Sequence, residues 1–121
     1  MNLSKSEEEL MNILWEKEPA FMKDLINAYP EPQPATTTIA TLLKRMTDKG
    51  FVSYETEGRS RKYISLVKKE DYFSKHVNGL IKNFFGDSAS QFASFFTRET
   101  DLSKKELEEI KKLIDEELKK K

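Results

Sequence analysis

The stretch "PATTTIATLLKRMTDKG", residues 34–50, decides the fold, because it joins a strongly patterned helix to an unusual run of three threonines. Its apolar residues recur at helical spacing and form a single stripe: Ile39, Leu42, Leu43 and Met46. Gly50 follows as a C-terminal stop that tolerates positive φ. The pattern predicts a helix that begins near Thr36 and buries one face.

The opposite face of this helix is predicted to be short-chained, hydrogen-bonding and basic. It comprises Thr37, Thr41 and Lys44, flanked by Thr38, Ala40 and Arg45. We expect a leading threonine, Thr36, to cap the helix through its hydroxyl. The following threonines would offer a hydroxyl and a methyl group to base edges or phosphates. The alternative is that the threonines only cap the helix and solvate its first turn.

After Gly50 the period of the pattern changes to two. The run "FVSYETEGRSRKYISLV", residues 51–67, predicts a strand, a turn around Glu57 to Ser60, and a return strand. The tip and the return strand of this hairpin carry Arg59, Arg61 and Lys62. The hairpin is therefore expected to be basic.

Two further helices are predicted before the threonine run. The first spans about Ser4 to Lys17 and opens with a capping box, Ser4 with Glu7. The second spans about Met22 to Tyr29 and is stopped by "PEPQP". Three helices followed by a hairpin are typical of a winged helix-turn-helix, whose third helix enters the DNA major groove while the wing touches the backbone. The predicted DNA-binding residues are Thr36, Thr37, Thr38, Thr41, Lys44, Arg45, Arg59, Arg61 and Lys62.

The second half of the chain predicts three more helices and a dimer interface. The helices are expected from Lys69 to Phe85, in "DSASQFASFFT" at residues 87–97, and after a capping box of Ser103 and Glu106. Six of the eight phenylalanines lie in the last 54 residues, too many for three small helices to bury alone. The predicted interface is Phe73, Val77, Leu80, Phe84, Phe92, Phe95, Phe96, Leu107, Ile110 and Ile114. The alternative is a monomer in which these residues pack on the winged helix of the same chain.

The overall composition hides a gradient of charge along the chain. Hydrophobic residues make up 37% and charged residues 35% of the 121, and the formal net charge is zero. Residues 36–67 nevertheless hold six cations against three anions, a net charge of +3, whereas residues 1–35 hold three against seven, a net charge of −4. Positive charge therefore gathers on the threonine helix and the hairpin.

Catalytic and metal chemistry find no support in the sequence. There is no cysteine, and no nucleotide-binding or nucleophile-elbow glycine pattern occurs. We therefore expect no enzyme, no cofactor and no metal site. The acidic start and the absence of a long apolar run favour a cytoplasmic protein with no membrane insertion.

The runs "SEEELMNILWEKEP", residues 6–19, and "TTIATLLKRMTDKGFVSYETEGRSRKYISLV", residues 37–67, resemble the penicillinase repressor family. The most specific pieces are "ILWEKEP" at 13–19, "TIATLLKRM" at 38–46, and the pattern of Gly58, Arg59, Tyr63 and Leu66. The resemblance covers essentially the whole chain. It implies a homodimeric repressor of a DNA operator, with a winged-helix DNA-binding domain at 1–67 and a helical dimerisation domain at 68–121.

The resemblance also implies a switch. In family members that respond to β-lactams, a membrane-bound sensor protease pathway leads to a cut in the C-terminal region, and the equivalent bond here is Phe95 to Phe96.

Two departures from the family are visible. Many members have basic residues where this chain has Thr37 and Ala40, which implies a different operator, and the cysteine-rich tail of the copper-sensing branch is missing.

A second class of function remains open at the level of sequence. A winged helix can act as a protein-protein interaction adaptor without binding DNA, and net neutrality favours that alternative. The gathering of cations on the third helix and the hairpin favours DNA, since a protein-binding face would be enriched in exposed aromatic residues.

Overall fold

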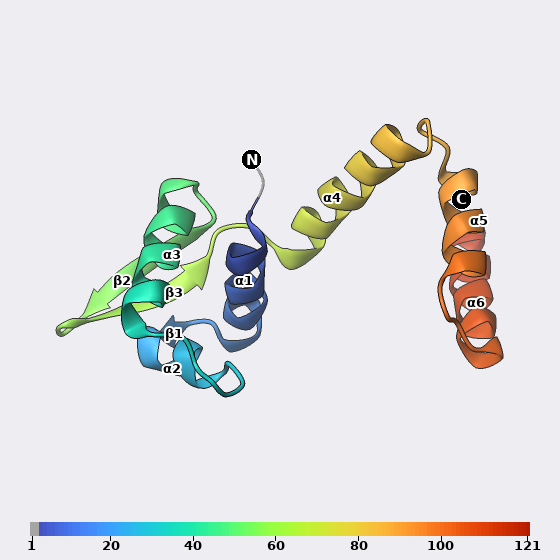
Figure 1. Ribbon diagram of the computed structural model, residues 1–121. Coiled ribbons are helices and arrows are strands. Elements are labelled where there is room, and N and C mark those ends of the chain that lie inside the picture. Colours follow the sequence, from blue (N-terminus) through green and yellow to red (C-terminus); the bar gives the residue numbers. More distant parts are fainter. Residues whose placement is uncertain (1–2) are drawn as a thin grey trace. The chain divides into compact units, whose positions relative to one another are not determined.

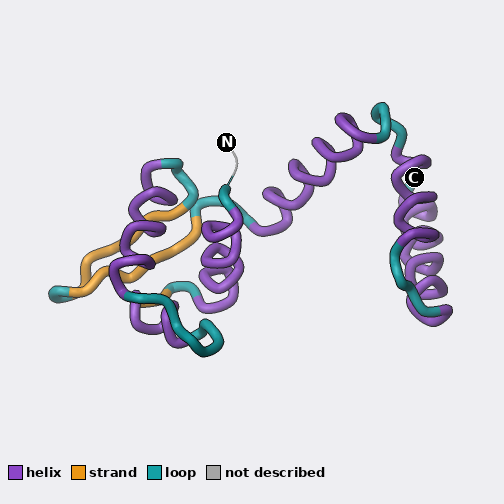
Figure 2. Tube along the Cα trace, in the orientation of Figure 1, coloured by secondary structure: helices purple, strands orange, loops and turns teal. Residues whose placement is uncertain are grey.

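The computed structural model of the protein describes residues 3–121. Helices dominate it, and a small sheet follows the N-terminal helices (Figures 1 and 2). In chain order the elements are α1 Lys5–Lys17, β1 Ala20–Phe21, α2 Met22–Asn27, α3 Thr36–Asp48, β2 Val52–Glu57, β3 Ser60–Ser65, α4 Lys69–Phe84, α5 Ala89–Glu99 and α6 Lys104–Lys120. The predicted fold class, a winged helix-turn-helix followed by a helical region, is confirmed.

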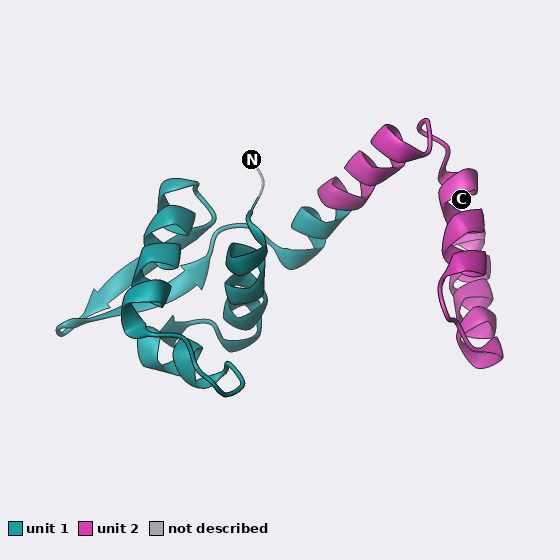
Figure 3. Ribbon diagram, viewed as in Figure 1, with its two compact units in different colours: residues 1–74 teal, residues 75–121 magenta. Residues whose placement is uncertain are grey.

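The chain divides into two compact units, Met1–Ser74 and Lys75–Lys121 (Figure 3). The division falls inside α4, a few residues beyond the end of the predicted DNA-binding domain at 67. The first turn of α4 belongs to the N-terminal unit because the ring of Tyr72 packs there, with centroids 6.0 Å from Trp15 and 5.9 Å from Phe51. Which function each unit performs stays a prediction.

The core of the N-terminal unit is built from the apolar stripes of its three helices and from the start of the hairpin. The largest fully buried apolar side chains are Leu10, Met11, Leu14, Leu25, Ile39, Leu43, Met46 and Val52. Three of the four residues in the α3 stripe are thus almost completely buried, and Leu42 is 8% exposed. Burial of this stripe fixes which face of α3 remains in solvent.

The sheet has three strands in the order β1-β3-β2, all antiparallel. The predicted hairpin is present, with Val52 opposite Ser65 and Glu57 opposite Ser60, and Gly58 in the turn has φ of 64°. Strand β1 was not predicted. It pairs Ala20 with Tyr63 and is only two residues long, which is too short to display a period in the sequence.

The N-terminus of α3 corrects one expectation. The N-cap is Ala35, whose backbone is extended and whose carbonyl accepts from the N–H groups of Thr38 and Ile39. Thr36 is the first helical residue and does not cap the helix through its hydroxyl. The prediction was wrong because a threonine caps only when it stands outside the helix, and the first helical turn here already includes all three threonines.

The C-terminal unit contains the rest of α4 together with α5 and α6. Ser88 caps α5, and the predicted capping box of Ser103 and Glu106 opens α6. An aromatic cluster joins the end of α4 to α5 through the ring pairs Phe85–Phe92, Phe85–Phe95 and Phe92–Phe96. No residue from 75 to 121 is buried, so this unit has no closed core within one chain.

No helix within residues 3–121 is both long enough and apolar enough to cross a membrane.

Candidate nucleic-acid interface

The exposed face of α3 presents threonine side chains in two different states. Thr36, Thr37 and Thr38 are exposed, and their hydroxyls make no hydrogen bond with another described residue. Thr41 is exposed too, but its Oγ1 donates to the backbone carbonyl of Thr37 over 2.9 Å. The first turn of α3 therefore presents hydroxyls that are not engaged within the described protein, whereas the hydroxyl of Thr41 in the second turn is already bonded to the backbone.

The predicted cations of α3 follow on the same side of the helix. Lys44 and Arg45 are both exposed. Lys44 Nζ lies 3.3 Å from Asp48 Oδ2, and the two side chains are 79% and 68% exposed. An ion pair this exposed is weak, so Lys44 can leave Asp48 for a phosphate at little cost.

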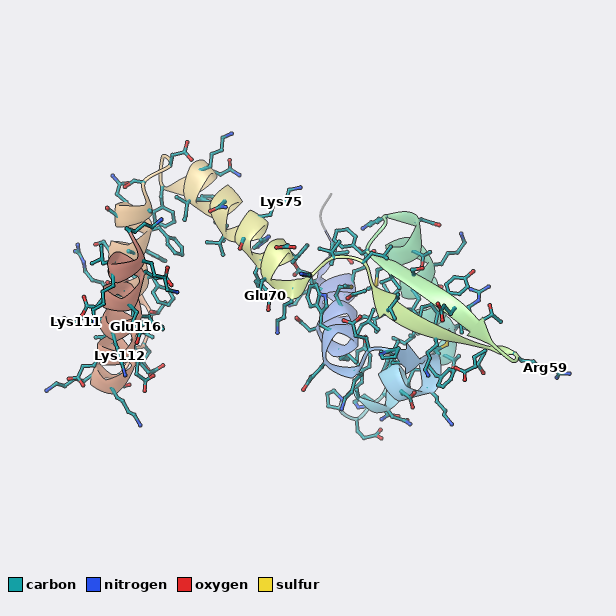
Figure 4. All side chains as sticks on the ribbon, turned by 180° about the vertical axis from the view of Figure 1, so that it is seen from behind. Arg59, Glu70, Lys75, Lys111, Lys112 and Glu116 are labelled. Atoms are coloured by element: carbon teal, nitrogen blue, oxygen red, sulfur yellow. The ribbon has the colours of Figure 1, made fainter. Side chains whose placement is uncertain are left out.

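Two of the three wing cations, Arg61 and Lys62, lie against aromatic rings. The guanidinium of Arg61 lies over the ring of Tyr54, 4.3 Å from its centroid, and Lys62 Nζ lies 5.3 Å from the centroid of Phe21. Lys62 also lies 3.5 Å from Glu57. Figure 4 shows Arg59 at the tip of the hairpin, extending away from the body of the unit. Stacking restricts the rotamers of Arg61 and prepares it for binding an anion.

An open groove of about 880 Å³ separates α3 from the wing. Its walls include Ala40 and Lys44 from α3, and Tyr54, Arg59 and Arg61 from the hairpin. Of the nine predicted DNA-binding residues, the groove thus brings together Lys44, Arg59 and Arg61. The other six, Thr36, Thr37, Thr38, Thr41, Arg45 and Lys62, do not line it.

Most residues that line this groove were not among the predicted DNA-binding residues, and two of them have side chains that bear on anion binding. Tyr54 forms the stack under Arg61, and Lys23 comes from the start of α2. The antiparallel register could have found Tyr54, because it pairs directly with Tyr63 and lies diagonally from Arg61. No signal in the sequence pointed to Lys23, because its place beside the groove depends on the tertiary contacts of α2 with α3 and β3.

An ion pair with one buried partner joins the end of α3 to α1. Lys49 Nζ, just after α3, lies 2.7 Å from Oε1 of Glu7, whose side chain is 2% exposed. Burial by itself raises the pKa of Glu7, but the hydrogen bonds from Lys49 and from the backbone and hydroxyl of Ser4, with the charge of Lys49, outweigh it and hold that pKa below its usual value. Glu7 is therefore a carboxylate at neutral pH.

The predicted dimer-interface residues are all at least partly open to solvent. Phe84 is the most exposed at 75%, and Ile114 is 55% exposed. The other members exposed to a similar or lesser extent are Phe73, Leu80, Phe95, Phe96 and Leu107, while Val77, Phe92 and Ile110 are half-buried. Leu113 and Leu118 of α6, which were not among the predicted residues, are 61% and 65% exposed.

Comparison with known proteins identifies the family of this chain. Residues 3–116 match the family described as Penicillinase repressor. The chain belongs to the penicillinase repressor family. It is a DNA-binding transcriptional repressor of that family and not an enzyme, and the resemblance seen in the sequence is confirmed.

Curated relatives match along nearly the whole chain. The Methicillin resistance regulatory protein MecI of Staphylococcus aureus (strain N315) is 28% identical over 114 residues, which cover 93% of each chain. The Penicillinase repressor of Bacillus licheniformis is 23% identical over 115 residues, covering 94% of this chain and 90% of the relative. The Penicillinase repressor of Staphylococcus aureus is 24% identical over 119 residues, covering 96% and 93%.

Proposed function

We propose that this repressor acts as a homodimer on a two-fold symmetric operator, with α3 in the major groove and the β2–β3 wing on the DNA backbone. The observation that carries the proposal is the groove between α3 and the wing, whose rims are formed by Lys44 on one side and by Arg59 and Arg61 on the other. A phosphodiester strand lying in this groove would meet cations from both elements.

The charge distribution supports the same orientation. The segment from 36 to 67, which includes α3 and the wing, carries a net charge of +3 in a chain whose net charge is zero. Lys49 is engaged by the buried Glu7, whereas four other cations of this segment are exposed: Lys44, Arg45, Arg59 and Arg61. Their placement favours DNA binding over action as a protein-binding adaptor. Membership of the family favours DNA binding too.

The state of the C-terminal unit supports a dimer. Large apolar side chains of α4, α5 and α6 are left exposed, and no residue from 75 to 121 is buried. Monomeric proteins seldom leave so many large apolar side chains in water, and a second copy of the same unit is the simplest cover. Two copies would also present two recognition helices to a symmetric pair of half-sites.

Relief of repression by proteolysis completes the proposal. The bond between Phe95 and Phe96 lies inside α5, and both side chains are exposed, 51% and 38%. A cut there would detach Phe96 and the whole of α6 from the rest of the chain. The dimer would lose the apolar residues Leu107, Ile110 and Ile114 together, and operator affinity would fall with dimer affinity. The trigger would be a membrane-bound sensor protease pathway acting on a cytoplasmic repressor.

A footprint on the DNA upstream of the repressor's own gene tests the proposal. The expected result is one protected region with two-fold symmetry, bound by two chains. Gel shifts with random DNA at low salt provide the comparison. Failure to bind either DNA would remove the operator-binding proposal and favour the adaptor, whereas protection of an asymmetric site by one chain would remove only the dimer.

A further inference from the structure

The second turn of α3 is chemically different from the first. The hydroxyl proton of Thr41 is donated to the carbonyl of Thr37, within the helix itself. A threonine has only a hydroxyl and a methyl group on Cβ. With the hydroxyl turned to the backbone, the methyl group becomes the main part of this exposed side chain that a base edge can meet.

The neighbouring residue strengthens this apolar character. Ala40 is exposed beside Thr41 and ends in a methyl group. Between Thr36 and Thr41, α3 contains no Arg, Lys, Asn or Gln, the side chains that read guanine or adenine through paired hydrogen bonds. This part of the helix can therefore discriminate bases only through single hydroxyls and through methyl groups.

The major groove contains one group that suits a methyl contact. Thymine is the base that carries a 5-methyl group there, and small apolar side chains recognise it by direct contact. Guanine presents only acceptors on that edge, which a hydroxyl whose proton is already used cannot satisfy. We propose that Thr41 is a specificity-determining residue that recognises the 5-methyl group of a thymine in each half-site, an inference that rests on the proposed insertion of α3 into the major groove.

The test begins with a bound sequence selected from random duplex DNA by the full-length protein. In that duplex each thymine of one half-site is replaced in turn by deoxyuridine, which removes the 5-methyl group and leaves base pairing unchanged. At one position the replacement is expected to weaken binding by about three- to fivefold, the effect of exposing one methyl group to water.

Three variants then identify the residue that contacts this methyl group. Thr41→Val keeps a methyl group and removes the hydroxyl, and should bind the thymine duplex within about twofold and keep the deoxyuridine effect, because the contact with thymine is made by the methyl group. Thr41→Ser keeps the hydroxyl and loses the methyl group, and should bind the thymine duplex about three- to fivefold more weakly and no longer distinguish deoxyuridine. Thr97→Ser is the matched control, because Thr97 is exposed and makes the same kind of internal bond, to the carbonyl of Ala93 over 2.9 Å, on α5 rather than on α3 or the wing.

Several results would overturn the inference while leaving the proposed function intact. One is a Thr41→Ser protein that retains the full deoxyuridine penalty at every position. Another is a Thr41→Val protein that loses as much affinity as Thr41→Ser, which would show that the hydroxyl reads the base. Failure to select any sequence from the pool is a different outcome, since it would contradict the proposed DNA binding and the inference together. Thermal melting of each variant confirms that these exposed substitutions leave the fold intact.

Discussion

Lys49 Nζ donates to Oε1 of Glu7 over 2.7 Å and so joins the end of α3 to the first turn of α1. The same carboxylate oxygen accepts from the backbone N–H of Ser4 over 2.7 Å, which closes the capping box of α1. The other oxygen, Oε2, is buried without a hydrogen-bond partner among the described residues. One carboxylate thus closes the capping box of α1 and joins α1 to the end of α3.

Replacing this carboxylate should destabilise the N-terminal unit. Glu7→Gln removes the charge beside Lys49 and weakens the capping box, and we expect a loss of about 2 to 4 kcal/mol in the free energy of unfolding. Glu16→Gln, an exposed change on the same helix, should be nearly neutral. Chemical denaturation followed by circular dichroism measures both, and equal stability of the two variants would contradict the role assigned to Glu7.

The lowered pKa of Glu7 predicts how stability depends on pH. Its carboxylate contributes stability at pH values above the unfolded pKa, about 4.5, and that stability is lost as pH falls through the lower folded pKa. The wild-type melting temperature should therefore fall more steeply between pH 6 and pH 3 than that of Glu7→Gln. Parallel curves for the two proteins would show that other carboxylates dominate acid unfolding.

Operator binding should depend steeply on salt. Each phosphate neutralised contributes about −0.9 to the slope of log K against log salt, so three to five cationic contacts from each of two chains predict a slope of about −5 to −9. Fluorescence anisotropy titrations of labelled operator across a range of potassium chloride concentrations measure it. A slope near zero is incompatible with the proposed interface.

The wing should contribute to DNA affinity irrespective of sequence, whereas α3 should contribute to discrimination between bases. Arg59→Ala and Arg61→Ala are expected to weaken all DNA sequences to a similar extent, because these residues lie where the backbone would pass. Thr38→Ala should instead change discrimination at one or two bases by about 1 to 3 kcal/mol. Arg98→Ala, in α5, controls for the loss of one positive charge. A change of base preference in Arg59→Ala, with nonspecific affinity spared, would mean that the wing reads bases.

The dimer should depend on the apolar stripe of α6. Ile114→Ser removes a side chain that is 55% exposed in one chain, and we expect dimerisation to weaken by about 1.5 to 3 kcal/mol. Glu116→Gln, on the same helix, serves as the control (Figure 4). Sedimentation equilibrium gives both dissociation constants. A protein that remains monomeric at every concentration, wild type included, would contradict the dimer.

Proteolysis is expected to leave a defined fragment. When cells receive the inducing signal, intact-mass spectrometry of the repressor should find a chain that ends at Phe95, together with a fall in operator occupancy. Because the bond lies inside α5, the helix must open locally before a protease can bind it in an extended form. Derepression in which every chain still ends at Lys121 would eliminate cleavage as the switch.

Most of the fold could be predicted from sequence because its signals are local. The apolar stripe from Ile39 to Met46 and the capping boxes of α1 and α6 depend on residues within one or two turns, and each is present in the structure. Strand β1 could not be predicted, because Ala20 and Phe21 become a strand only through pairing with Tyr63 and Lys62, far along the chain.

The candidate site was predictable in part for the same reason. Exposure of the α3 threonines follows from the stripe opposite them, so their place on the outer face needed no tertiary information. The stack of Arg61 on Tyr54 and the ion pair of Lys49 with Glu7 join residues on different elements. Sequence alone placed Lys49 among the cations near the DNA-binding helix, and only the tertiary structure shows that this one is held by a carboxylate.

The packing of Tyr72 against Trp15 makes Trp15 an intrinsic fluorescent probe of the contact between α1 and the first turn of α4. Trp15 is the single tryptophan in the sequence, and its indole Nε1 donates to the carbonyl of Val67 over 2.8 Å while its ring lies against Tyr72. Tyr72 in turn donates its hydroxyl to Glu8 of α1 over 2.8 Å. The tryptophan fluorescence of the protein therefore originates where the first turn of α4 packs on α1, and its emission wavelength would report any loosening of that contact without an attached dye.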